Sequence, residues 1–206
     1  DVRTILGFDG LVVLDSGAFG KSVEKDPVVV YERQKKLMPE IAILLDEIPS
    51  LRYSQEAERQ AINTTIQNAR RIKKLNKGKL MLMAVAQGNS ERLLKSCSSR
   101  LKAMGFNLIG IPLSHYSKYR QYAEAINKVK RLQSFFPQDT TFHGLGCGSR
   151  TMIAILAHFG VRFFDSSAYY KTALHGNAVK PISFCSINKP GSKKECNASL
   201  LKQRTP

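Results

Sequence analysis

Six short, nearly continuous apolar runs divide this chain of 206 residues, and most are followed by a polar or glycine-rich turn and then a stretch of helical periodicity. Strands that are buried on both faces of a parallel sheet have this kind of sequence. The runs therefore predict strands at 11–14, 41–45, 80–86, 108–113, 141–145 and 161–164.

The segments between these runs predict helices. Asp26 followed by Pro27 is typical of a helix start, because aspartate caps a helix and proline is favoured in its first turn. Pro39 closes that segment, since proline cannot continue a helix. Apolar stripes of helical spacing predict further helices over 54–72, 90–101, 119–132 and 152–159.

Regular alternation of strand and helix predicts an α/β fold with a parallel sheet and right-handed crossovers. Two closures compete: an open, doubly wound sheet, or a (β/α) TIM-type barrel that is seen in part. A complete barrel has eight units and takes about 250 residues. We therefore predict an incomplete barrel of about six units over 1–178, followed by a basic tail over 179–206.

Charge is distributed unevenly along the chain. The net charge is +16, with −3 in residues 1–50 and +19 in residues 51–206. Such a basic excess indicates a polyanionic partner, nucleic acid ahead of a membrane surface, although solubility alone stays open as an explanation. The densest cluster of cations, a candidate nucleic-acid contact, comprises Arg70, Arg71, Lys73 and Lys74.

The four cysteines are too few and too scattered for a disulfide framework, which indicates a reducing compartment. No apolar run approaches the length of about 18 residues that a membrane-spanning helix needs. The N-terminus also lacks the pattern of a secretory signal. We expect a cytoplasmic protein without a membrane partner.

Reactive or hydrogen-bonding residues stand at the ends of nearly all the predicted strands. In parallel α/β folds, active sites form at the carboxyl ends of the strands. We therefore expect these residues to share one site, although any single one of them could cap a helix instead. The series comprises Asp15, Ser16, Asp46, Glu47, Gln87, Gly88, Gly110, His143, Gly144, Asp165 and Ser166.

Residues 15–22 offer a competing interpretation, because they are one residue short of a phosphate-binding P-loop that ends in Lys21 and Ser22. That loop needs glycine where Asp15 stands, since backbone N–H groups wrap the phosphate there. The helix is also expected to start several residues later, at Pro27. A P-loop-like nucleotidase is therefore kept only as a second alternative.

Taken in order, the strand-end motifs resemble the tRNA-guanine transglycosylases, the queuine or archaeosine tRNA-ribosyltransferases. Those enzymes exchange a guanine in nucleic acid for a 7-deazaguanine base. The likeness covers roughly residues 10–174, and segments 111–113 and 164–169 are closer to the archaeal branch and to DNA-modifying relatives. The resemblance implies a pentosyltransferase of queuosine or archaeosine biosynthesis.

The resemblance also assigns roles. Asp165 matches the nucleophile that attacks the ribose C1′ and holds a covalent glycosyl intermediate, as a carboxylate does in retaining glycosidases. Asp15 matches the second aspartate, a general acid and base. Asp46 and Gln87 match the residues that read the edge of the guanine-like base. Further contacts to the base are expected from Ser16, Gly88, Gly110, His143 and Gly144.

Two departures from the family pattern bear on activity. Only 14 residues precede Asp15, where the family has about two strand–helix units, so a fragment or a degenerate paralogue is expected. The family's structural zinc is bound by three cysteines and a histidine, whereas only Cys185 and Cys196 stand in the tail. We expect no cofactor for the chemistry and at most a partial zinc site at these two residues.

The expected partners are tRNA or DNA, which the sequence does not separate, and a 7-deazaguanine base. A homodimer or heterodimer is also open. The first alternative to an active enzyme is a catalytically inactive paralogue that binds nucleic acid and supports another subunit.

Overall fold

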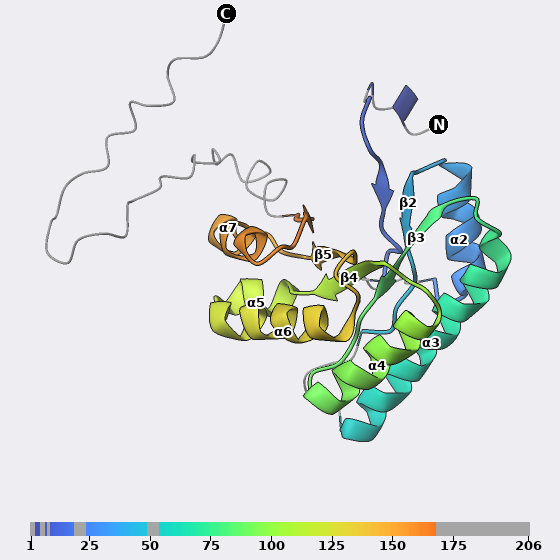
Figure 1. The fold of residues 1–206 in the computed structure, drawn as a ribbon. Helices are drawn as coiled ribbons and strands as arrows, with labels where there is room; N and C mark the ends of the chain where they lie inside the picture. The colour runs from blue at the N-terminus through green and yellow to red at the C-terminus, as the bar shows by residue number, and fades with distance from the viewer. Residues whose placement is uncertain (1–2, 5–6, 8, 19–23, 49–53, 168–206) are drawn as a thin grey trace, which may run out of the picture. The chain divides into compact units, whose positions relative to one another are not determined.

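A computed structural model describes residues 3–4, 7, 9–18, 24–48 and 54–167 of the chain (Figure 1). Within these ranges all six predicted strands are present and all pair in parallel. Residues 168–178 and the predicted tail over 179–206 lie outside the described residues. The strands are β1 (Val13–Leu14), β2 (Ile41–Ile43), β3 (Met81–Val85), β4 (Leu108–Pro112), β5 (Thr141–Leu145) and β6 (Phe163–Phe164).

Strand order decides between the two closures that the sequence left open. The strands pair as β1-β2-β3-β4-β5-β6, so each strand lies next to its neighbour in sequence. A doubly wound sheet reverses its order at a switch point, and this sheet has no reversal. The six parallel strands curl into part of a barrel and alternate with helices, which confirms the incomplete (β/α) barrel.

Three of the helices that connect the strands begin at the polar or proline residues where the sequence predicts a helix start. Asp26 caps the first of them, since its Oδ1 accepts a hydrogen bond of 2.9 Å from the backbone N of Val28. Ser54 and Ser90 cap the next two in the same way, as predicted. The helices are α2 (Pro27–Lys36), α3 (Gln55–Asn76), α4 (Glu91–Ala103), α5 (Ser114–Tyr119), α6 (Tyr122–Phe135) and α7 (Arg150–His158).

The helix expected over 119–132 is broken in two. Arg120 adopts a left-handed conformation with φ of 56°, which ends α5 at Tyr119. α6 then starts at Tyr122. Tyr119 therefore does not belong to the buried stripe of α6, and 57% of its surface is exposed.

The sheet has an apolar cluster on each face. The larger cluster fills the space between the strands and the helices, and it includes Ile66, Leu101, Ile109 and Leu132, all fully buried. The smaller cluster lies on the other face, which is the inner face of the partial barrel. Its members are Ile41, Ile43, Met83 and Val85, with Val13, Leu108 and Leu145 packed against them. Among the described helices, none is long and apolar enough to cross a membrane.

Candidate active site

Most of the predicted catalytic and base-binding residues lie at one edge of the sheet. Because the strands are parallel, their carboxyl ends point the same way. Ser16 follows Asp15 there, and Gly88 follows Gln87. Asp15 comes directly after β1, Asp46 shortly after β2, Gln87 after β3 and Asp165 directly after β6, while Gly110, His143 and Gly144 lie within β4 and β5.

Several of these side chains also share the inner face. Successive side chains in a strand alternate between the two faces. Asp15 therefore continues the face of Val13, and Gln87 continues the face of Val85. His143 shares its face with Leu145, which packs on the same inner cluster. Residues from β1, β3 and β5 thus carry polar groups at the same edge and on the same face.

Asp46 and Gln87 form a direct pair. The Nε2 of Gln87, which is 2% exposed, donates a hydrogen bond to Oδ2 of Asp46. Burial raises the pKa of the Asp46 carboxyl to about 6, since a charged carboxylate is costly away from water. The Gln87 hydrogen bond opposes this rise in pKa, and the nearby charge of Asp15 adds to it. Asp15, Asp46 and Gln87 thus form one interacting group.

Gln34 holds the backbone that carries Asp15, and the sequence-based prediction missed it. This buried glutamine of α2 donates through Nε2 to three backbone carbonyls, those of Leu14 (3.2 Å), Asp15 (3.1 Å) and Ile43 (2.9 Å). It therefore ties the carboxyl end of β1 to that of β2. A signal was available: Gln34 lies three residues after Tyr31 on the buried side of α2, where an apolar residue is expected.

The side chain of Asp15 itself folds back on its own turn. Its Oδ1 accepts a hydrogen bond of 2.8 Å from the backbone N of Ser16. The hydroxyl of Ser16 is buried and has no hydrogen-bond partner among the described residues. Buried polar atoms are usually satisfied, so an unpaired hydroxyl at this edge is a donor that a ligand can use.

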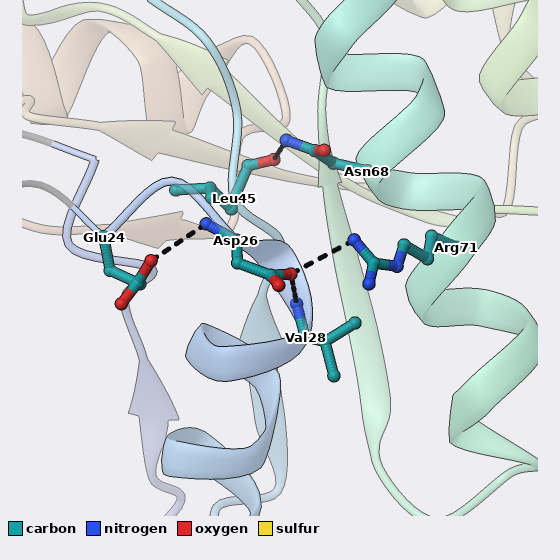
Figure 2. Close-up of polar contacts among 6 residues, drawn as sticks. All are labelled: Glu24, Asp26, Val28, Leu45, Asn68 and Arg71. Carbon is teal, nitrogen blue, oxygen red and sulfur yellow. Dashed lines mark hydrogen bonds and ion pairs between the residues drawn. The ribbon is translucent and has the colours of Figure 1, made fainter.

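Two side chains of α3 fix the segment after β2. Asn68 donates through Nδ2 to the carbonyl oxygen of Leu45 at 3.2 Å, and Figure 2 shows this contact. The hydroxyl of Thr65 accepts a hydrogen bond of 2.9 Å from the backbone N of Glu47. Asp46 lies between these two anchored residues, so its backbone is held from both sides.

The turn after β3 requires glycine. Gly88 has a φ of +142°, and a Cβ atom built on it would lie 2.5 Å from the backbone N of Leu94. The next residue, Asn89, donates its backbone N–H to the carboxylate of Glu58 on α3. This tight turn fixes the direction in which Gln87 leaves the strand.

A second group forms around Asp165. The backbone N of Gly146 donates to both carboxylate oxygens of Asp165, at 3.0 Å each. The Nε2 of His143 lies 3.1 Å from Oδ1 of Asp165, although neither ring nitrogen of this buried histidine makes a well-aligned hydrogen bond. The Asp165 side chain remains half exposed. A carboxylate that is held by a backbone N–H and still open to solvent is suited to meet a substrate.

Charge around Asp165 affects the neighbouring thiol. The pKa of Cys147 is raised to about 11, first by burial and then by the carboxylate of Asp165. The thiol therefore stays protonated and is unsuited to act as a nucleophile near neutral pH.

Gly110 and Gly144 are small for different reasons. A Cβ atom on Gly110 would lie 2.8 Å from Cδ1 of Leu145, on the inner face. A Cβ atom on Gly144 would approach Leu113 and Phe164 within 3.2 Å, on the face that packs against the helices. Packing therefore explains glycine at both positions, against side chains of opposite faces, and only Gly110 lies on the inner face.

Among the described residues, no hydrogen bond or ion pair links the group of Asp15, Asp46 and Gln87 to the group of His143 and Asp165. What the two groups share is the edge and the face of one sheet. Buried polar atoms without partners occur in both groups, on Ser16 in the first and on His143 in the second. Their assignment to one site is therefore a proposal that rests on this shared placement.

The predicted nucleic-acid contacts lie along the second half of α3. α3 runs from the carboxyl end of β2 back to the amino end of β3, so its last residues approach the opposite edge. Arg71 pairs with Asp26 at 3.1 Å, as Figure 2 shows, and the Lys73 ammonium donates to the carbonyl of Met104 at the end of α4. Arg70, Lys73 and Lys74 line a shallow hollow of about 300 Å³ there, together with Met104.

No three His, Cys, Asp or Glu side chains within the described ranges come together as a metal site. Cys185 and Cys196, the two cysteines of the possible zinc site, lie outside those ranges, as do Lys21 and Ser22 of the P-loop interpretation. The helix after β1 begins at Pro27, as predicted, rather than directly after the glycine-containing segment.

The chain was compared with known proteins. The family model described as Queuine tRNA-ribosyltransferase matches residues 9–199. A tRNA-guanine(15) transglycosylase of Methanococcus aeolicus is 30% identical over 218 residues, which cover 100% of this chain and 33% of the relative. Enzymes of the same name from Methanocaldococcus jannaschii and Sulfolobus acidocaldarius are 28% and 26% identical, cover 82% of this chain in both cases, and are themselves covered over 27% and 36%. The chain thus spans about a third of the length of these relatives.

Proposed function

Because this chain belongs to the queuine tRNA-ribosyltransferase family, we propose that it forms the catalytic part of a base-exchange transglycosylase. The substrate is tRNA, in which a guanine is replaced by a 7-deazaguanine base. The relatives named tRNA-guanine(15) transglycosylase support tRNA over DNA as the nucleic acid. The observation that carries the proposal is the placement of Asp15, Gln87 and His143, with its neighbour Asp165, at one edge and on one face of the sheet.

In the proposed reaction a carboxylate oxygen of Asp165 attacks the ribose C1′. The bond from C1′ to the guanine nitrogen breaks, and the base leaves with the electron pair. The transition state resembles an oxocarbenium ion, which a neighbouring carboxylate stabilises and then captures as a glycosyl ester. The N–H of Gly146 orients the two carboxylate oxygens for this attack.

Asp15 manages the proton in both half-reactions. In its protonated form it gives a proton to the departing guanine, and as a carboxylate it then accepts a proton from the incoming base. The nitrogen of that base attacks C1′, and the Asp165 carboxylate is released. Apart from the proton transfers through Asp15, only C–N and C–O bonds form and break, so two carboxylates are sufficient for the chemistry.

Asp46 and Gln87 recognise the base. Guanine and its deaza analogues present an N–H and an amino group side by side, which a carboxylate can accept together. The Gln87 amide offers a donor and an acceptor beside it. Because Asp46 must be deprotonated to accept both hydrogen bonds, the raised pKa of this residue sets the lower pH limit of recognition.

The test is exchange of radiolabelled guanine into tRNA by the chain. We expect incorporation by the wild type and none by Asp165→Asn. Retention of tRNA without any incorporation by the wild type would contradict the proposal and favour the inactive nucleic-acid-binding paralogue. Incorporation into DNA but not into tRNA would contradict the choice of nucleic acid.

A further inference from the structure

We propose that α5, together with Arg120, forms a surface on which unpaired RNA bases stack beside the reacting nucleotide. The inference rests on the proposed function. It adds a binding site for the nucleotides that flank the target base. A nucleotide must leave its helical stack to reach an enclosed reaction site, so its neighbours are expected to be unpaired as well. Unpaired RNA bases are typically bound by aromatic and cationic side chains together.

α5 lies directly against the group around Asp165. The backbone N of Leu113, the residue before α5, donates to the carbonyl of Leu145 at 2.9 Å, which extends the pairing of β4 and β5. A Cβ atom on Gly146 would lie 2.8 Å from the Cβ of Ser114, the first residue of α5. Since Gly146 donates to both oxygens of Asp165, only one residue separates α5 from the proposed nucleophile.

The buried side of α5 is anchored to the rest of the fold. The hydroxyl of Ser117 accepts a hydrogen bond of 3.2 Å from the backbone N of Ser149, the residue that caps α7. Tyr116 packs against the main apolar cluster. Arg120 then ends the helix in a left-handed conformation. These contacts hold the short helix in a fixed position on the fold.

The solvent-exposed side of α5 carries aromatic rings and cations. Tyr119 is 57% exposed, the highest value among the exposed large apolar side chains of the described residues. The His115 ring lies with its centroid 4.7 Å from that of Tyr119, and the Lys118 ammonium lies 5.2 Å from the Tyr119 ring. Lys118 and Arg120 are exposed, and residues 114–120 include no acidic side chain.

This combination matches RNA. An exposed tyrosine ring offers a flat apolar surface to any base, and the adjacent cations neutralise the phosphates that pass over it. The basic cluster of α3 is less suited to this role, because Arg71 and Lys73 already contact Asp26 and Met104. The surface on α5, by contrast, adjoins the residue that we assign as the nucleophile.

The experiment measures the affinity of the full chain for a fluorescently labelled, unstructured RNA of about 12 nucleotides by anisotropy. We expect Tyr119→Ala to weaken binding about 5- to 100-fold, the range found when a stacking aromatic is removed. Tyr119→Phe should bind like the wild type, because the ring is kept. Lys118→Ala should reduce the dependence of affinity on salt, by about one unit in the log–log slope.

Controls separate this surface from general effects of charge or folding. Lys74→Ala removes an exposed cation from α3 and should change affinity less than Lys118→Ala does. RNA that carries 4-thiouridine should crosslink under ultraviolet light to the peptide that contains Tyr119. Equal RNA affinity of the wild type and Tyr119→Ala, or no RNA binding by the wild type, would overturn the inference. Binding that depends on Tyr119 for the matching DNA and not for RNA would overturn it as well.

The outcomes also distinguish the inference from the proposed function. Binding of labelled free guanine does not involve α5 in this account, so Tyr119→Ala should retain it. If Tyr119→Ala keeps both its exchange activity and its RNA affinity, the stacking surface is refuted and the proposed enzyme activity is not. RNA binding that depends on Tyr119 without any guanine exchange by the wild type would instead remove the enzyme and leave the surface.

Discussion

Gln87 donates a side-chain hydrogen bond to the carboxylate of Asp46, although 41 residues separate them in the sequence. The contact joins the ends of two neighbouring strands, β2 and β3. It places an amide and a carboxylate side by side at the edge where the strands end. A pair of this composition matches the hydrogen-bonding edge of guanine. Because the carboxylate of this pair is buried, the residues that suit base recognition also lower the stability of the fold.

We predict that Asp46→Asn stabilises the chain near neutral pH. The folded-state pKa of about 6 exceeds the ordinary aspartate pKa of 3.8, so the buried carboxylate lowers the free energy of unfolding as pH rises from about 4 to 6. Asparagine does not ionise, and its oxygen can still accept from Gln87. The gain at pH 7 should be at most about 3 kcal/mol, which corresponds to the shift in pKa.

Urea unfolding of both proteins at several pH values checks this prediction. At pH 3.5 the carboxyl is neutral in the folded state and mostly neutral in the unfolded state, so the two proteins should then be about equally stable. A variant that is less stable than the wild type at pH 7 would show that the carboxylate is better satisfied than its burial indicates.

The binding of free guanine should depend on pH through the same group. We expect affinity to rise as pH increases from 5 to 7, with a midpoint near the Asp46 pKa of about 6, because only the carboxylate accepts both donors of the base. Equilibrium dialysis with labelled guanine measures this. Asp46→Asn should bind weakly and without the pH step, and an unchanged step in that variant would assign the titration to another group.

We predict that Gln34→Met destabilises the fold and also weakens base binding. Methionine fills a similar volume but leaves the carbonyls of Leu14, Asp15 and Ile43 without their donor. The expected loss in the free energy of unfolding is about 2–4 kcal/mol, since buried acceptors then go unpaired. Gln67→Met, which changes an exposed glutamine of α3, should cost less than about 0.5 kcal/mol. Equal effects of the two substitutions would remove Gln34 from its assigned role.

Gly88→Ala should be far more damaging than Gly78→Ala. Both glycines have positive φ, yet a Cβ atom at Gly78 meets nothing within 4 Å, whereas at Gly88 it would overlap the backbone of Leu94. Gly78→Ala should therefore cost about 1 kcal/mol for its backbone conformation alone. Gly88→Ala should cost several times more or displace Gln87, which thermal unfolding and guanine binding would register. A Gly88→Ala protein that matches Gly78→Ala in both measurements would contradict the tight turn.

The arrangement of strands could be predicted from the sequence because a strand buried on both faces leaves a strong local signal. The runs at 41–45, 108–113 and 141–145 each contain the strand that the structure shows. Helix starts at Ser54 and Ser90 were equally local, since a cap acts on residues three positions away. The break at Arg120 was missed, because apolar spacing continues across it and only the backbone conformation interrupts the helix.

The contacts that shape the site could not be predicted from the sequence. Gln34 acts on carbonyls 9 to 20 residues away, and the pairing of Arg71 with Asp26 spans 45 residues. Such contacts depend on how α2 and α3 pack, which no local pattern encodes. For the same reason the contacts of Arg71 with Asp26 and of Lys73 with Met104 could not be predicted, and the role of this cluster in binding nucleic acid stays a prediction.

The proposal depends most on the role of Asp165 as the nucleophile that attacks C1′. The direct measurement is mass spectrometry of the covalent adduct formed when the chain is incubated with tRNA and a base analogue that slows release. We predict an adduct on the peptide that contains Asp165 in the wild type, no adduct in Asp165→Asn, and a slowed adduct in Asp15→Asn. An undiminished adduct in Asp165→Asn would contradict the account.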